Sequence, residues 1–387
     1  MTVEPSKDPA TRRLQLPYIS SALKFEQAVG NKFAAGVAEM DFGVSAPIIE
    51  DLTVALSSRQ LGYLEPTLAR STIDACSDWL GRNCDWDVDP ESIGLISDAA
   101  GGIRVAYEVA MRLCGAVIHE DPVYPRLSAG ASSVGLSSIG VPFLEKGGRY
   151  VHDLDRLELE LMRSGGPSVI VLCNPHNPTG SVASREELRQ LSRLVDRYSG
   201  LVISDEVHAP LVYSRNIHIP YATVSRSAAE HSITLFSASK GWNISGLKCA
   251  QVIIPNSKLR DFWSEAPSSE FVSNGVSRLG AVATKSAYLD RSAWRDSVIS
   301  ELEGNAQALS QIGTSSGKFS VVKPQGSFMA WIGRTGNVDP QRTARARFER
   351  VGAFVEPGHK FSKRGAGFVR LNFGMPRSML DQLLAAL

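Results

Sequence analysis

Short apolar runs alternate with helical patterns through the middle of the chain. Runs of four to six residues rich in apolar side chains predict strands at 92–97, 116–119, 168–173, 201–204, 232–237 and 249–254. The run at 168–173 is apolar on both faces, which is typical of a parallel strand covered by helices on each side. Alternating strands and helices predict a doubly wound α/β lobe.

Helical patterns at 102–113 and 185–198 fall between these strands. The second pattern follows Ser184, with Glu187 three residues later. In such a capping box, the serine hydroxyl accepts a bond from one free N–H and the glutamate accepts a bond from another. We therefore expect a helix to begin at this point.

The pattern changes after about residue 281 to long helical segments and then to strands at 319–322, 328–332 and 367–373. This change predicts a second lobe of the α+β class. A chain of 387 residues also exceeds the size of one ordinary hydrophobic core. We expect residues 1–46 to pack on a small domain formed by 281–387, and residues 47–280 to form the large domain.

Charge and composition narrow the possible partners and location. The 41 Lys and Arg residues nearly balance 40 Asp and Glu residues, so long-range electrostatics favour neither nucleic acid nor an anionic membrane. No apolar run reaches the length of a membrane span, and the start of the chain lacks the apolar core of a secretory signal. Five scattered cysteines without a CxxC pair indicate buried free thiols, a reducing cytoplasm and no metal site.

Two groups of polar residues follow buried strands, where α/β sheets bind their ligands. The first, 173–180, contains two Asn-Pro pairs and a glycine, which predict a rigid turn. The second, 204–208, contains Asp205 at the end of a predicted strand. A buried carboxylate needs a partner, and a protonated heterocyclic nitrogen would be one. Capping of the next segment is the alternative role of Asp205.

A third group, 237–248, surrounds a lysine with groups suited to phosphate. Ser237 and Ser239 stand close to Lys240, and a second cation, Lys248, follows eight residues later. Hydroxyls and a cation can bind a phosphate, while nearby positive charge lowers the pKa of a lysine and favours a nucleophilic amine. An exposed surface lysine is the alternative.

These three groups, followed by Arg370-Leu371-Asn372-Phe373, resemble the fold-type-I superfamily of enzymes that depend on pyridoxal 5′-phosphate (PLP), the class I/II aminotransferases. The resemblance extends from about Ala38 to the end of the chain. It implies the α/β fold of aspartate aminotransferase, with a large, mostly parallel sheet domain and a smaller α+β domain. It also implies PLP as the cofactor, held as a Schiff base on Lys240.

The resemblance assigns roles around the cofactor ring. Lys240 would also act as the general base, and Asp205 would pair with the ring nitrogen. Asn177 would bond the phenolic oxygen of the ring, with His208 nearby. Tyr124 would stack on the ring and, like Asn177, contact the substrate.

The resemblance also assigns residues that would bind the phosphate and the substrate, and one that would reach a partner subunit. Ser237, Ser239, Lys248 and the backbone of Ala100 and Gly101 would bind the phosphate, because backbone amides at a helix start favour anions. Arg370 would bind the α-carboxylate of an amino acid substrate. Tyr63 would reach the phosphate of a neighbouring subunit, which implies a homodimer with a shared active site.

Three stretches, 38–42, 121–125 and 205–211, resemble the carbon–sulfur lyases similar to cystathionine β-lyase. This subgroup splits L-cystathionine or related cysteine S-conjugates into a thiol, pyruvate and ammonia. Glu39 replaces the usual Asp, Pro210 replaces an acidic residue, and 97–101 lacks the usual Pro-Gly. Because the same residues serve transamination, an aminotransferase is the alternative. A catalytically silent binding or regulatory protein is a third reading, disfavoured by the retained site residues.

Overall fold

The computed structural model describes Leu16 and residues 22–316, 319–334 and 343–387. The remaining residues, including 1–15 and 17–21 of the expected N-terminal segment, lie outside the described part. Within that part, the helices are α1 (Ala22–Glu26), α2 (Ala46–Ser57), α3 (Pro66–Cys84), α4 (Ala99–Leu113), α5 (Pro125–Ala129), α6 (Leu154–Ser164), α7 (Arg185–Arg197), α8 (Arg226–Glu230), α9 (Ala238–Gly241), α10 (Ser257–Ser264), α11 (Ser269–Asn274), α12 (Arg278–Leu289), α13 (Trp294–Ser316), α14 (Ala344–Arg350) and α15 (Arg377–Ala386).

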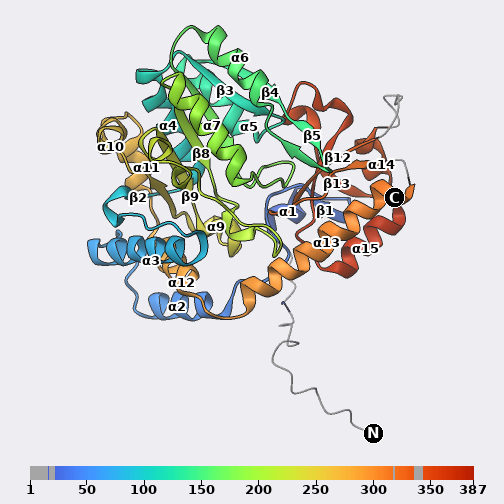
Figure 1. The fold of residues 1–387 in the computed structure, drawn as a ribbon. Helices are drawn as coiled ribbons and strands as arrows, with labels where there is room; N and C mark the ends of the chain where they lie inside the picture. The colour runs from blue at the N-terminus through green and yellow to red at the C-terminus, as the bar shows by residue number, and fades with distance from the viewer. Residues whose placement is uncertain (1–15, 17–21, 317–318, 335–342) are drawn as a thin grey trace.

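A seven-stranded sheet forms the centre of the larger lobe (Figure 1). Its order is β2 (Ile93–Ile96), β10 (Ala250–Ile253), β9 (Ser232–Phe236), β8 (Leu201–Asp205), β7 (Ser168–Cys173), β3 (Ala116–Asp121) and β4 (Ser137–Pro142). The strands from β9 to β4 run parallel, whereas β10 is antiparallel to both neighbours. The expected mostly parallel α/β sheet is confirmed.

Helices cover both faces of this sheet, as the apolar strands predict. Every residue of β7, β8 and β9 is buried. One face packs with α4 and α10, and the other packs with α6 and α7 (Figure 1). Helix α7 begins with the predicted capping box: the Glu187 N–H donates to Ser184 Oγ over 3.3 Å, and the Ser184 N–H donates to Glu187 Oε2 over 2.9 Å.

A second, five-stranded sheet lies beside the first (Figure 1). Its order is β1 (Phe33–Ala35), β13 (Ala353–Pro357), β14 (Val369–Asn372), β12 (Met329–Arg334) and β11 (Phe319–Val321). Only β1 and β13 pair in parallel. A hairpin of β5 (Leu144–Lys146) and β6 (Arg149–Val151) completes the strands of the described residues.

Helix α12 spans residue 280, where we expect a domain boundary, and it packs against α2 and α3. The division into residues 1–46, 47–280 and 281–387 therefore stays a prediction. All five cysteines are buried and free, as expected. Among the described helices, none combines the length and the apolar character that crossing a membrane requires.

Candidate active site

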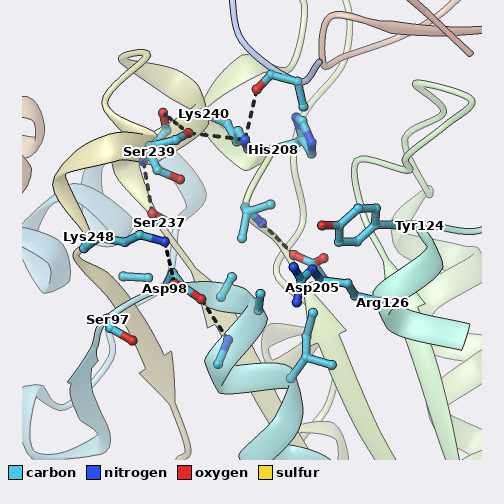
Figure 2. A pocket seen from close by; sticks show the side chains of 18 of the residues that line it. Ser97, Asp98, Tyr124, Arg126, Asp205, His208, Ser237, Ser239, Lys240 and Lys248 are labelled. Carbon is cyan, nitrogen blue, oxygen red and sulfur yellow. Dashed lines mark hydrogen bonds and ion pairs between the residues drawn. The ribbon is translucent and has the colours of Figure 1, made fainter. Parts of the chain in front are cut away.

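A cavity of about 520 Å³ opens where β3, β7, β8 and β9 end and α4 begins (Figure 2). Ligands bind at this edge of α/β sheets because the loops that follow the strands converge there. Ten of the predicted site residues line the cavity: Ala100, Gly101, Tyr124, Asn177, Asp205, His208, Ser237, Ser239, Lys240 and Lys248. The structure thus brings together groups from four strand ends and one helix start.

Lys240 lies in the short helix α9, directly after β9. Ser237 begins this helix, and its Oγ accepts a bond of 3.0 Å from the Ser239 N–H. Lys240 Nζ donates to Ala38 O over 3.0 Å and to Ser245 Oγ over 3.2 Å. Burial lowers the pKa of Lys240 to about 8, although the negative charge of Glu39 acts to raise it. A larger share of this amine is therefore neutral and nucleophilic than of an ordinary lysine.

Asp205 ends β8 and faces the same cavity (Figure 2). Its Oδ1 accepts a bond of 3.3 Å from the Val207 N–H. Burial raises the pKa of Asp205 to about 6, although that N–H works in the opposite direction. A buried carboxylate that borders an open cavity is suited to a cationic partner there. The protonated nitrogen of a pyridine ring fits this requirement.

Arg370, from β14 of the second sheet, does not itself line the cavity but contacts Asn177, which does. It donates to Asn177 Oδ1 over 3.3 Å and to Gly36 O over 2.7 Å, and its guanidinium lies 4.9 Å from the centre of the Phe361 ring. Its Nε finds no hydrogen-bond partner among the described residues. Burial lowers the pKa of Arg370 to about 10, so the group remains charged at neutral pH. A charged fork with a free donor is suited to a carboxylate.

Tyr124 and His208 provide the aromatic walls of the cavity (Figure 2). His208 Nδ1 lies 3.0 Å from Ser327 Oγ, and its ring meets the edge of Phe328. Burial lowers the pKa of His208 to about 3, and the positive charge of Lys240 adds to this shift. His208 is therefore a neutral ring with one donor and one acceptor nitrogen.

The groups expected to bind phosphate gather at the start of α4. Lys248 Nζ lies 2.9 Å from Asp98 Oδ2, and the Gly101 N–H donates to Asp98 Oδ1 over 2.8 Å. Sequence reasoning assigned Asp98 no role. Its position before a helix nevertheless marks it as an N-cap, and that signal could have placed it in the site.

Other residues of the cavity were also absent from the prediction. They include Ala38, Ser245 and Arg126. Ala38 precedes Lys240 by 202 residues, so no local pattern connects the two. Tyr63, in contrast, does not line the cavity of this single chain, and 98% of its surface is exposed.

Comparison with known proteins identifies the family of the chain. Residues 36–387 match the family described as aminotransferase class I and II. The chain is 32% identical to cystathionine beta-lyase PatB of Bacillus subtilis, over 89% of each chain. It is 30% identical to cystathionine beta-lyase of Corynebacterium glutamicum, over 89% of this chain and 90% of the relative. The structure of cystalysin from Treponema denticola, which contains pyridoxal 5′-phosphate, has a TM-score of 0.87 at 23% identity, covering 96% of this chain and 98% of that one.

The family match extends over nearly all of the described chain, both sheets included. The fold agrees as well, since the cystalysin chain superimposes over almost its whole length. The chain therefore belongs to the aminotransferase class I and II family.

Proposed function

We propose that the chain is a PLP-dependent carbon–sulfur β-lyase. Its substrates would be L-cystathionine or related cysteine S-conjugates, and its products a thiol, pyruvate and ammonia. The observation that carries the proposal is the placement of Lys240 and Asp205 on one cavity, together with about 30% identity to two cystathionine β-lyases over most of the chain.

The residues of the cavity fit PLP in both charge and position. Asp205 would hold the ring nitrogen, and Asn177 and His208 would lie toward the phenolic oxygen. Tyr124 would contact the face of the ring. The phosphate would bind the start of α4 with Ser237, Ser239 and Lys248. Bound PLP supplies a conjugated, protonated ring that accepts electrons when a bond at the substrate Cα breaks.

The remaining chemistry is performed by side chains of this chain. Arg370 would bind the α-carboxylate of the substrate through its planar fork and so fix the direction of the Cα–H bond. As a free amine, Lys240 Nζ would accept the Cα proton, and its pKa of about 8 suits a general base near neutral pH. Loss of that proton prepares departure of the thiolate from Cβ, and one water molecule completes the balance to pyruvate and ammonia.

Transamination is the alternative outcome of the same residues. Arg370 and Lys240 would bind the substrate and accept its Cα proton in both reactions. The difference lies in whether Lys240 would give up the proton it has accepted to complete an amino-group transfer or a group would leave the substrate Cβ. A direct product assay separates the two reactions.

The decisive experiment incubates purified protein with L-cystathionine and measures pyruvate with lactate dehydrogenase, without any keto acid. We expect steady pyruvate release by the wild type. The rate of the Lys240→Ala variant should be about 10²- to 10⁴-fold lower, because the general base is absent. The control, Lys258→Ala, changes an exposed lysine and should retain the wild-type rate. Product that forms only after a keto acid is added would instead establish an aminotransferase.

We also propose that the enzyme is a cytoplasmic homodimer. Five buried free thiols are consistent with a reducing compartment. Tyr63 is almost fully exposed in one chain, and apolar side chains of α2, including Val54 and Leu56, are exposed beside it in sequence. A second copy packed on this surface would cover them and could bring Tyr63 to the phosphate of its partner.

A further inference from the structure

The part of the cavity proposed for phosphate already contains an anion from the chain. The carboxylate of Asp98 lines the cavity and bonds the two groups that a phosphate would use there (Figure 2). One oxygen lies 2.9 Å from Lys248 Nζ, and the other accepts the Gly101 N–H at 2.8 Å. This side chain therefore already binds both the ammonium group of Lys248 and the backbone N–H at the start of α4.

Asp98 is charged under ordinary conditions. Burial acts to raise its pKa, but the bonds from Lys248 and the Gly101 amide, with the charge of Arg126, lower the pKa overall. Arg126 also lines the cavity. At the start of α4, Lys248 is therefore paired with a permanent anion, and an incoming phosphate dianion meets a weaker positive field than Lys248 alone would produce.

We propose that Asp98 is an internal competitor of the cofactor phosphate for Lys248 and for the start of α4. The chain then binds a phosphate-bearing cofactor less tightly than it would with a neutral side chain at position 98. This inference rests on the proposed PLP function, and it identifies a residue that sets how tightly the cofactor is bound.

Competition follows from the number of donors. The Gly101 N–H has one hydrogen to donate, so it cannot fully serve a carboxylate and a phosphate together. Lys248 could contact both anions, but a carboxylate and a phosphate held beside one ammonium repel each other. Binding of phosphate therefore requires Asp98 to release at least one contact or to tolerate a neighbouring negative charge.

A purely structural role for Asp98 makes a different prediction. As the N-cap of α4, Asp98 satisfies a free backbone N–H, and asparagine or serine caps a helix about equally well. Asp98→Asn therefore removes the charge and keeps the cap. If capping is the only role, this variant should bind PLP as the wild type does.

The experiment measures the Kd of the cofactor-free protein for PLP and for pyridoxal, which lacks the phosphate, by quenching of tryptophan fluorescence. Asp98→Asn should lower the Kd for PLP by about tenfold, as expected when one contact between charged groups no longer has to be displaced. The Kd for pyridoxal should stay unchanged. The matched control is Asp153→Asn, which changes the N-cap of α6 and should alter neither Kd.

Each result separates this inference from the proposed function. The proposed competition is overturned if Asp98→Asn binds PLP with the same Kd as the wild type. It is also overturned if the substitution lowers the Kd for PLP and the Kd for pyridoxal equally. Absence of PLP binding by the wild type overturns the proposed function itself. If Asp98→Asn unfolds at lower temperature than the wild type, Asp98→Ser provides the same comparison with another capping residue.

Discussion

At the scale of single residues, burial shifts Lys240 and Asp205 away from their ordinary charged forms. The pKa of the lysine falls to about 8 and that of the aspartate rises to about 6. Both shifts have desolvation as their largest cause. Because burial disfavours the ionised form of each side chain, these two residues lower the folding stability of the cofactor-free protein.

Replacement of Asp205 by asparagine should therefore stabilise the cofactor-free protein. The ordinary pKa of this carboxyl is 3.8 and the folded value is about 6. The folded state thus retains a proton that the unfolded state loses, and wild-type stability falls as pH rises from about 4 to 6. At pH 7 the variant should be more stable by about 2–3 kcal/mol, from about 1.4 kcal/mol for each pKa unit.

Urea unfolding at pH 4 and pH 7 measures this difference. The advantage of Asp205→Asn should vanish near pH 4, where the wild-type carboxyl is protonated in the folded state. Asp87→Asn, which changes an exposed aspartate, is the control and should show no comparable pH dependence. An equal advantage at both pH values would show that the charge is not its cause.

At the scale of elements, the segment 36–42 crosses from the second sheet to the cavity. Gly36 O accepts a bond from Arg370, Ala38 O accepts one from Lys240, and Glu39 O accepts one from Asn372. Beyond these contacts, Asp41 pairs with Lys24 of α1 at 2.8 Å, and both side chains are fully buried. This ion pair therefore joins α1 to a segment that contacts two residues of the site.

Loss of one partner of the pair should destabilise the protein strongly. Lys24→Met leaves Asp41 buried without its cation, which typically costs about 3–5 kcal/mol. Addition of Asp41→Asn should restore a large part of that loss, because the remaining group is then neutral. Chemical unfolding of the single and double variants measures the coupling. Lys258→Met controls for removal of an exposed lysine, and a double variant as unstable as the single one would contradict the expectation.

At the scale of the whole molecule, the cavity depends on two sheets and, in our proposal, on two chains. Lys240 and Asp205 line the cavity from the larger lobe, while Arg370 of the second sheet contacts Asn177, which also lines it. Tyr63 stands outside the cavity of its own chain, in the connection between α2 and α3. An almost fully exposed tyrosine, with exposed apolar residues close to it in the sequence, is consistent with an interaction surface.

The dimer can be tested with two substitutions of different kinds. Tyr63→Phe should leave a dimer in sedimentation experiments but raise the Kd for PLP by about tenfold, through loss of one hydrogen bond to a charged group. Val54→Asp places a charge on the exposed face of α2 and should yield monomers. A wild type that sediments as a monomer at all concentrations would refute the homodimer. A Tyr63→Phe variant with unchanged cofactor affinity would refute the contact of Tyr63 with the phosphate of the partner.

The central strands were predictable because burial on both faces leaves a continuous apolar run. β7 has the predicted bounds, and β8 and β9 differ from prediction by one residue at one end. β4 was missed because it lies at an edge of the sheet and carries exposed serines. β1 was missed because three residues are too few to show a period.

Several of the predicted site residues were visible in the sequence because they follow buried strands, and strand ends of a parallel sheet converge. Arg370 lies within a strand of the second sheet, and only the resemblance to a family indicated it. The contact of Lys240 with Ala38, the buried pair of Lys24 and Asp41, and the carboxylate of Asp98 between Lys248 and Gly101 became apparent from the folded chain alone. Periodicity reports which face of an element is buried. It does not report which distant side chain meets that face, because such contacts depend on how whole elements pack.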